Sequence, residues 1–102
     1  MQIPPAQITY KKKIGKIDEN TVYEIGTKGG LHLVMAVRKN KAETLGVGPH
    51  RAVARHIAQK REPTMVLTDL SKSDWAEPAS YAHLVEKYEE KTALARQIQG
   101  LD

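Results

Sequence analysis

Residues 46–56 read Gly-Val-Gly-Pro-His-Arg-Ala-Val-Ala-Arg-His, and the hydrophobic period of the chain changes within this stretch. Before it, apolar residues alternate as they do in β-strands. After it, they recur at helical spacing and form an apolar stripe over residues 53–58. Gly48-Pro49 is typical of a helix start, and Glu62-Pro63 predicts the end of that helix. The stretch therefore divides the chain into a strand-forming part and a part that contains helices.

Upstream, short turn signals separate four strand-like segments. They run from Gln7 to the turn at residues 18–20, and then over residues 21–27, 31–38 and 42–47. The connections are too short for crossovers, so we expect an antiparallel meander. In the third strand one alternating set should face the core and the other should be only partly covered. The first set is Leu31, Leu33, Met35 and Val37, and the second is His32, Val34, Ala36 and Arg38.

Downstream of the helix, the pattern predicts a fifth strand over residues 64–70 and a second helix over residues 80–99. The order β-β-β-β-α-β-α predicts an α+β fold, in which an antiparallel β-meander of four to five strands carries two helices on one face. Residues 1–6 contain Pro4-Pro5 and should be a flexible lead-in. Residues 7–102 then form a single domain.

The composition excludes several classes of protein. Apolar residues make up 40% of the 102 residues and aromatic residues only 5%, so we expect a thin, mainly aliphatic core. Cysteine is absent, which excludes disulfides, thiol nucleophiles and cysteine zinc sites. The four histidines lack the spacing that places two metal ligands on one helix face, so we expect neither a metal nor a cofactor. We see no signal peptide and no membrane-spanning run, and we expect a cytoplasmic protein.

The net charge of +4 favours an acidic partner, nucleic acid first. A glycine-containing junction before a helix exposes backbone N–H groups that attract anions, and a basic face of that helix can follow phosphates. Alternatively, the glycines only permit a tight turn, and the strand lysines only prevent edge-to-edge aggregation. Arg51 and Arg55 are expected on the exposed helix face. The residues that we predict to bind nucleic acid are Gly48, His50, Arg51, Arg55, Lys60 and Arg61, together with Lys11 and Lys13.

Part of the chain resembles the β-β-β-α half of a double-stranded RNA-binding domain. The resemblance rests on residues 22–25, 31–37 and 45–48, and on His50-Arg51 at the start of a basic, alanine-rich helix. It implies that the start of the helix contacts the phosphates of a duplex. The resemblance covers only about residues 22–61. The chain departs from the family in having a lysine-rich strand where the family has its leading helix, and in its additional strand and long last helix.

Two other functions remain open. The last helix carries Tyr88, Leu94 and Ile98, which can form the interface of a homodimer or of a protein–protein adaptor. The Gly-x-Gly junction at residues 46–48 also resembles the acetyl-CoA loop of a family of acetyltransferases, which implies a small acyl-CoA-dependent transferase. Because no catalytic constellation is apparent, the sequence favours a non-enzymatic binding domain over an enzyme.

Overall fold

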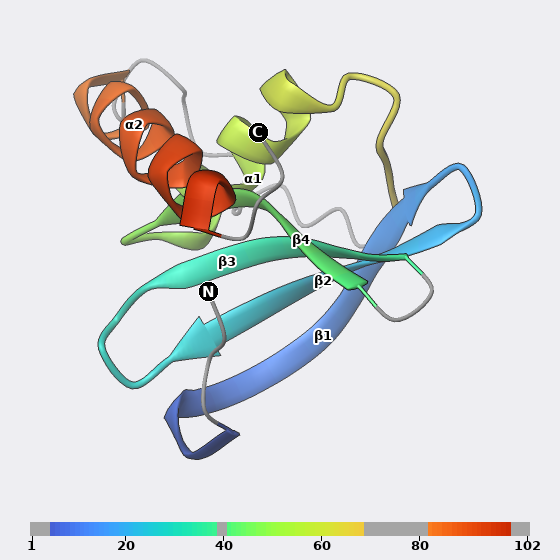
Figure 1. Cartoon of the computed structure of the whole chain (residues 1–102), viewed down its shortest axis with the longest axis horizontal. Helices are drawn as coiled ribbons and strands as arrows, with labels where there is room; N and C mark the ends of the chain where they lie inside the picture. Colours follow the sequence, from blue (N-terminus) through green and yellow to red (C-terminus); the bar gives the residue numbers. More distant parts are fainter. Residues whose placement is uncertain (1–4, 39–40, 69–81, 99–102) are drawn as a thin grey trace.

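The computed structural model describes residues 5–38, 41–68 and 82–98 (Figure 1). Its elements are η1 (Pro5–Gln7), β1 (Ile8–Ile17), β2 (Asn20–Thr27), β3 (His32–Arg38), β4 (Lys41–Gly48), α1 (Arg51–Arg61), β5 (Val66–Leu67) and α2 (Ala82–Ile98). The predicted order of strands and helices is confirmed. The fifth strand is shorter than predicted, and the 3-10 helix η1 includes the end of the predicted lead-in. Residues 1–4 and both ends of the predicted last helix lie outside the described residues.

The strands form one sheet in the order β4-β3-β2-β1-β5, and all of its strand pairs are antiparallel. The β1–β2 turn uses Asp18 at φ 53°, and the β2–β3 turn uses Gly30 at φ 84°. Asp and Gly tolerate this left-handed conformation, which tight hairpin turns require. The predicted meander is therefore confirmed, and these two turns lie where the polar and glycine signals placed them, while residues 39–40 of the predicted turn between β3 and β4 lie outside the described residues.

Helix α1 crosses one face of the sheet, which we call the α1 face. Its small residues Ala54 and Ala58 are fully buried against Val34 and Leu45. A side chain at Gly46 in β4 would collide with the Ala54 carbonyl oxygen. The alanines of α1 and the glycine of β4 therefore allow the helix to approach the sheet closely, which small residues make possible.

Helix α2 packs beside α1 and against β4 (Figure 1). Val85 joins Val53 and Ile57 of α1 in a small apolar cluster. Arg96 donates from Nη1 to the backbone oxygen of Thr44 in β4 at 2.8 Å. No helix in the described segments is long and apolar enough to cross a membrane.

The middle of β3 is buried on both faces, so the prediction of a partly covered second set is wrong for Val34 and Ala36. Val34 and Ala36 on the α1 face are 0% and 2% exposed, while Leu33 on the opposite face is 1% exposed. The opposite face has its own cluster of Ile25, Leu33, Met35 and Val47, against which Tyr88 of α2 packs. His32, at the start of the strand on the α1 face, is half-buried. Leu31, predicted in the core, precedes the strand and is 37% exposed.

Candidate functional site

A row of four residues crosses the α1 face from β1 to β4. Tyr10 pairs with Gly26, Gly26 with His32, and His32 with Gly48. A side chain at Gly26 would collide with the Tyr10 ring. Glycine in a strand interior weakens the strand, and it often marks a close approach by another group. Here the bare backbone of Gly26 leaves space for the Tyr10 ring, and Tyr10 reaches His32 from two strands away.

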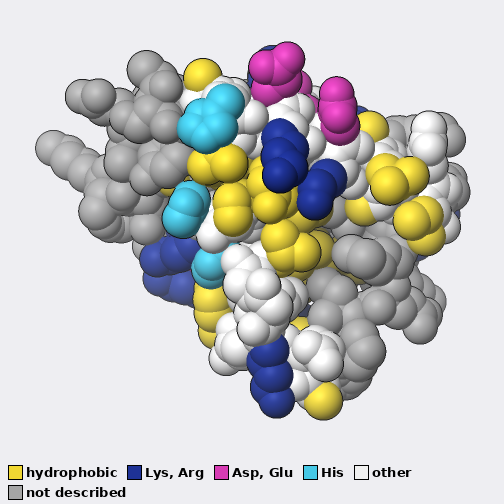
Figure 2. Space-filling model, turned by 90° about the vertical axis from the view of Figure 1, so that its left-hand side faces the viewer, with side chains coloured by type: hydrophobic (Ala, Val, Ile, Leu, Met, Phe, Trp, Pro, Cys, Tyr) yellow, Lys and Arg dark blue, Asp and Glu magenta, His cyan; other side chains and the backbone are white. Residues whose placement is uncertain are grey.

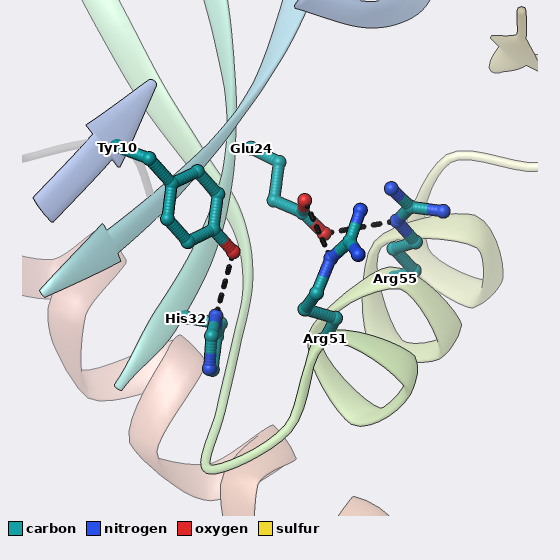
Figure 3. Close-up of polar contacts among 5 residues, drawn as sticks. All are labelled: Tyr10, Glu24, His32, Arg51 and Arg55. Atoms are coloured by element: carbon teal, nitrogen blue, oxygen red, sulfur yellow. Dashed lines mark hydrogen bonds and ion pairs between the residues drawn. The ribbon is translucent and has the colours of Figure 1, made fainter. Parts of the chain in front are cut away.

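A fully buried carboxylate lies next to this row. Glu24 of β2 is 0% exposed, and its two oxygens each accept from an arginine of α1 (Figure 3). Arg51 Nε lies 2.8 Å from Oε2, and Arg55 Nε lies 3.0 Å from Oε1. The two arginines are four residues apart, so both project from one side of the helix. The pairing offsets the large cost of removing the Glu24 and Arg55 charges from water.

Tyr10 and His32 complete what we call the Glu24 cluster, which consists of Tyr10, Glu24, His32, Arg51 and Arg55. The Tyr10 hydroxyl lies 2.8 Å from His32 Nδ1 (Figure 3). Burial raises the pKa of Tyr10 to about 12, and the negative charge of Glu24 also raises it, against the opposing charges of Arg51 and Arg55. Burial lowers the pKa of His32, and the charges of Arg51 and His50 lower it as well, against the opposing effect of Glu24. Groups with perturbed pKa values are candidates for function.

A second basic feature lies on the opposite face of the sheet, along β1. Lys11 pairs with Ile25, Lys13 with Tyr23, and Lys16 with Thr21, so the three lysines share that face. A β-bulge between Lys13 and Gly15 returns Lys16 to the same side as Lys13. All three side chains are exposed, and Lys11 Nζ lies 4.5 Å from the centroid of the Tyr23 ring. We call Lys11, Lys13 and Lys16 the lysine row.

The structure separates the residues that the sequence grouped together. The lysine row lies on the face opposite α1, while Arg51 and Arg55 bind Glu24 on the α1 face. The prediction that Arg55 lies on the exposed side of the helix is wrong, because its side chain is 0% exposed. Arg51 lies at the rim of the cluster, where 36% of its side chain is exposed.

The other predicted residues of the helix region lie at its two ends. Gly48 is the buried last residue of β4, where a side chain would crowd Val53, and His50 is the exposed N-cap of α1. At the far end, Lys60 Nζ binds Glu89 Oε1 at 2.8 Å. Lys60 and Arg61 line an open groove of about 470 Å³ between the helices, together with Ile57, Glu89, Glu90 and Ala93. Carboxylates therefore oppose the positive charge at this end.

The predicted interface residues do not share one environment. Tyr88 is half-buried between α2 and the sheet, whereas Leu94 and Ile98 are 57% and 67% exposed. Leu94 and Ile98 are four residues apart and so lie on one side of the helix. The structure thus leaves two of the three predicted side chains on the surface of α2.

The sequence contained a signal for the Glu24 cluster that our prediction missed. Glu24 is a single acidic residue among Val22, Tyr23 and Ile25 in a strand that reads as buried. Buried charges are normally paired, so this residue required a cationic partner from a distant segment. Arg51 and Arg55, four residues apart on α1, are these cationic partners.

Among residues 5–38, 41–68 and 82–98, no group of three or more histidine or acidic side chains is placed to hold a metal ion. Comparison with protein-family models, curated proteins and solved structures finds no match to this chain.

Proposed function

We propose that this protein binds the sugar–phosphate backbone of a nucleic acid along β1. The observation that carries the proposal is the lysine row, three exposed cations on one face of one strand. Alternate residues of a strand are about 6.8 Å apart, so the ammonium groups form a linear array of charge. Such an array releases counterions when it neutralises successive phosphates, which supplies affinity independent of sequence.

The aromatic ring beside the row supports the same proposal. Tyr23 lies directly across from Lys13 and accepts the Lys11 ammonium over its face. Aromatic side chains between cations can stack on bases while lysines hold the backbone. Lys12 faces the other way, pairing with Glu24, so β1 presents exposed lysines on both sides. The proposed contact surface is therefore β1, with the lysine row on one face and Lys12 on the other.

The test is fluorescence anisotropy with labelled RNA and DNA, single-stranded and duplex, over a range of salt concentrations. We expect Lys11→Ala with Lys13→Ala to weaken binding. With duplex DNA the slope of log K against log salt should decrease by about 1.8, since each lost phosphate contact removes about 0.9. The matched control, Lys28→Ala with Lys41→Ala, removes the same charge from exposed positions outside the row. If the lysine-row variant and the control variant have equal salt slopes, binding depends on net charge alone and not on the lysine row. Absence of binding by the wild type at low salt would refute the proposal.

Exposed apolar side chains favour self-association as a second candidate function. Leu94 and Ile98 expose more than half of their surface on one side of α2, and C2 dimers are the commonest oligomers. We expect light scattering to show a mass that rises with concentration, and Ile98→Glu to abolish the rise. Gln97→Glu adds the same charge at a neighbouring exposed position and serves as the control. A constant monomer mass at high concentration would exclude this candidate.

A further inference from the structure

The short strand β5 places an apolar side chain on the outer surface of the sheet. Met65 and Leu67 are 4% and 9% exposed and belong to the apolar cluster that α1 covers. Successive residues of a strand point to opposite faces, so Val66 points to the face opposite α1, and it is 62% exposed. Single exposed apolar residues are ordinary on protein surfaces, so what matters is which side chains surround Val66.

Val66 lies directly across from Lys16, the last residue of the lysine row. Residues opposite each other in an antiparallel pair have Cβ atoms about 4.5–5.5 Å apart. On the β2 side of β1, Lys16 pairs with Thr21, and Lys13 pairs with Tyr23. The lysine row therefore runs along one face of the sheet between Val66 on the β5 side and Tyr23 on the β2 side.

Close backbone contacts hold β5 against β1 at this point. A side chain at Gly15 would collide with the carbonyl oxygen of Val66, so β5 approaches β1 where β1 has no side chain. The backbone N–H of Thr68 donates to the backbone oxygen of Ile14 at 2.8 Å, and Thr68 Oγ1 donates to the same oxygen at 3.3 Å. Val66 is thus presented from a backbone that its neighbours fix in place.

The lysine row has uncharged cross-strand neighbours on this face. The residues that pair with its lysines are Ile25, Tyr23, Thr21 and Val66. By contrast, basic and acidic side chains lie near one another on the face shown in Figure 2, which includes the mixed-charge helix α2. Cross-strand pairing therefore does not neutralise the row, which keeps its positive charge for an external anion.

We propose that this site takes single-stranded nucleic acid in preference to duplex, an inference that rests on the proposed binding along β1. The lysine row holds successive phosphates, while one unpaired base lies on Val66 and another on the Tyr23 ring. Lys11 lies over that ring in the unbound protein, and its flexible stem lets the ammonium group move to a phosphate and open the ring to a base.

The preference follows from where the bases lie in each form. In a duplex the faces of the bases are stacked on one another inside the helix, so Val66 and Tyr23 gain no contact with them and only the phosphate contacts remain. In a single strand the base faces are open to apolar and aromatic side chains. Such contacts do not read the hydrogen-bonding edges of the bases, so the site should distinguish strandedness and not sequence.

The test compares anisotropy titrations of one labelled DNA oligonucleotide, alone and annealed to its complement, at one low salt concentration. We expect the single strand to bind about fivefold or more tightly than the duplex, since stacking of one base on an aromatic ring is worth at least about that factor. Val66→Ser should weaken single-strand binding about fourfold, the equivalent of about one buried methylene group. It should leave duplex binding unchanged, because Val66 then contacts no base.

A substitution in the opposite direction uses the same exposed position. Val66→Tyr adds a ring beside Lys16 and should strengthen single-strand binding about fivefold or more, again without effect on the duplex. The matched controls are Leu31→Ser and Leu31→Tyr. Leu31 is 37% exposed and follows Thr27, at the end of β2 away from the Thr21–Lys16–Val66 row, so both control variants should bind as the wild type does.

An abasic single strand separates base contacts from phosphate contacts. It keeps the phosphates and lacks the bases, so the wild type should bind it about fivefold or more weakly than the complete strand. Val66→Ser should not weaken this binding further.

The outcomes separate this inference from the proposed function. Equal affinity of the wild type for single strand and duplex, or equal weakening of both by Val66→Ser, would overturn the single-strand preference and leave binding along β1 intact. Equal affinity for the complete and the abasic strand would overturn it as well. No binding of any of these forms at low salt would overturn the proposed function, and the inference with it.

Discussion

Replacing Glu24 by Gln tests whether the buried cluster is held by charge. The side chain keeps its size, but the negative charge between Arg51 and Arg55 is removed. Arg55 is 0% exposed, as is Glu24, so in the variant the buried guanidinium of Arg55 keeps its positive charge but loses the carboxylate of Glu24. Arg51 is 36% exposed and can turn towards solvent.

The expected loss follows from this difference in exposure. Breaking a buried ion pair on one side costs about 3–5 kcal/mol, because an uncompensated charge remains. A domain of this size has only about 5–15 kcal/mol of stability in total. Arg51→Gln should cost much less, about 1 kcal/mol, since solvent already screens part of that interaction. We therefore expect Glu24→Gln to destabilise the protein several times more than Arg51→Gln does.

The assay is urea unfolding followed by far-ultraviolet circular dichroism, together with thermal melting. Each 1 kcal/mol lowers Tm by about 4–8 °C in a domain of about 100 residues, so Glu24→Gln should lower Tm by about 12 °C or more. Adding Arg55→Met should recover at least half of the loss, because the buried cation is then gone. Equal losses for Glu24→Gln and Arg51→Gln, or no recovery in the double variant, would refute the reasoning.

Three other predictions concern the same face of the sheet. Gly26→Ala should displace the Tyr10 ring, with which the new methyl group would collide, and the strain should cost about 1–3 kcal/mol in urea unfolding; unchanged stability would contradict this. The pKa of His32 is lowered in the folded state, so its contribution to stability is present above its unfolded pKa of about 6.5. That contribution is lost as pH falls through the lowered pKa, and unfolding free energies between pH 7.5 and 5 should vary less in His32→Gln than in wild type. The pKa of Tyr10 is raised to about 12, so an ultraviolet titration of the native protein should show a late phenol that Tyr10→Phe lacks. A wild-type titration curve without this late phenol would contradict the raised pKa of Tyr10.

Local patterns were sufficient to predict most of the fold. The alternation of apolar residues located β1 to β4, and Asp18 and Gly30 occupy the turns that the polar and glycine signals marked. The apolar stripe of α1 was predicted correctly, since its residues at 53, 54, 57 and 58 are all buried. These features depend on neighbours within a few positions, which is the range over which backbone period and turn chemistry act.

The positions of the charged residues could not be predicted in the same way. Arg55 belongs to a basic helix in the sequence, yet it is buried because Glu24 lies across from it, 31 positions earlier in the chain. Lys16 joins Lys13 on one face only because a bulge shifts the phase of β1. Sequence spacing within one element reveals neither a partner on another strand nor a bulge.

The sequence by itself determined the order of elements, the antiparallel meander and a net charge of +4. Only the tertiary structure decided how those charges are divided. It placed the lysine row on one face of the sheet and used Arg51 and Arg55 to neutralise Glu24 on the other. The reason is that burying a carboxylate requires partners in contact, and only the close approach of α1 to the sheet brings those partners within reach.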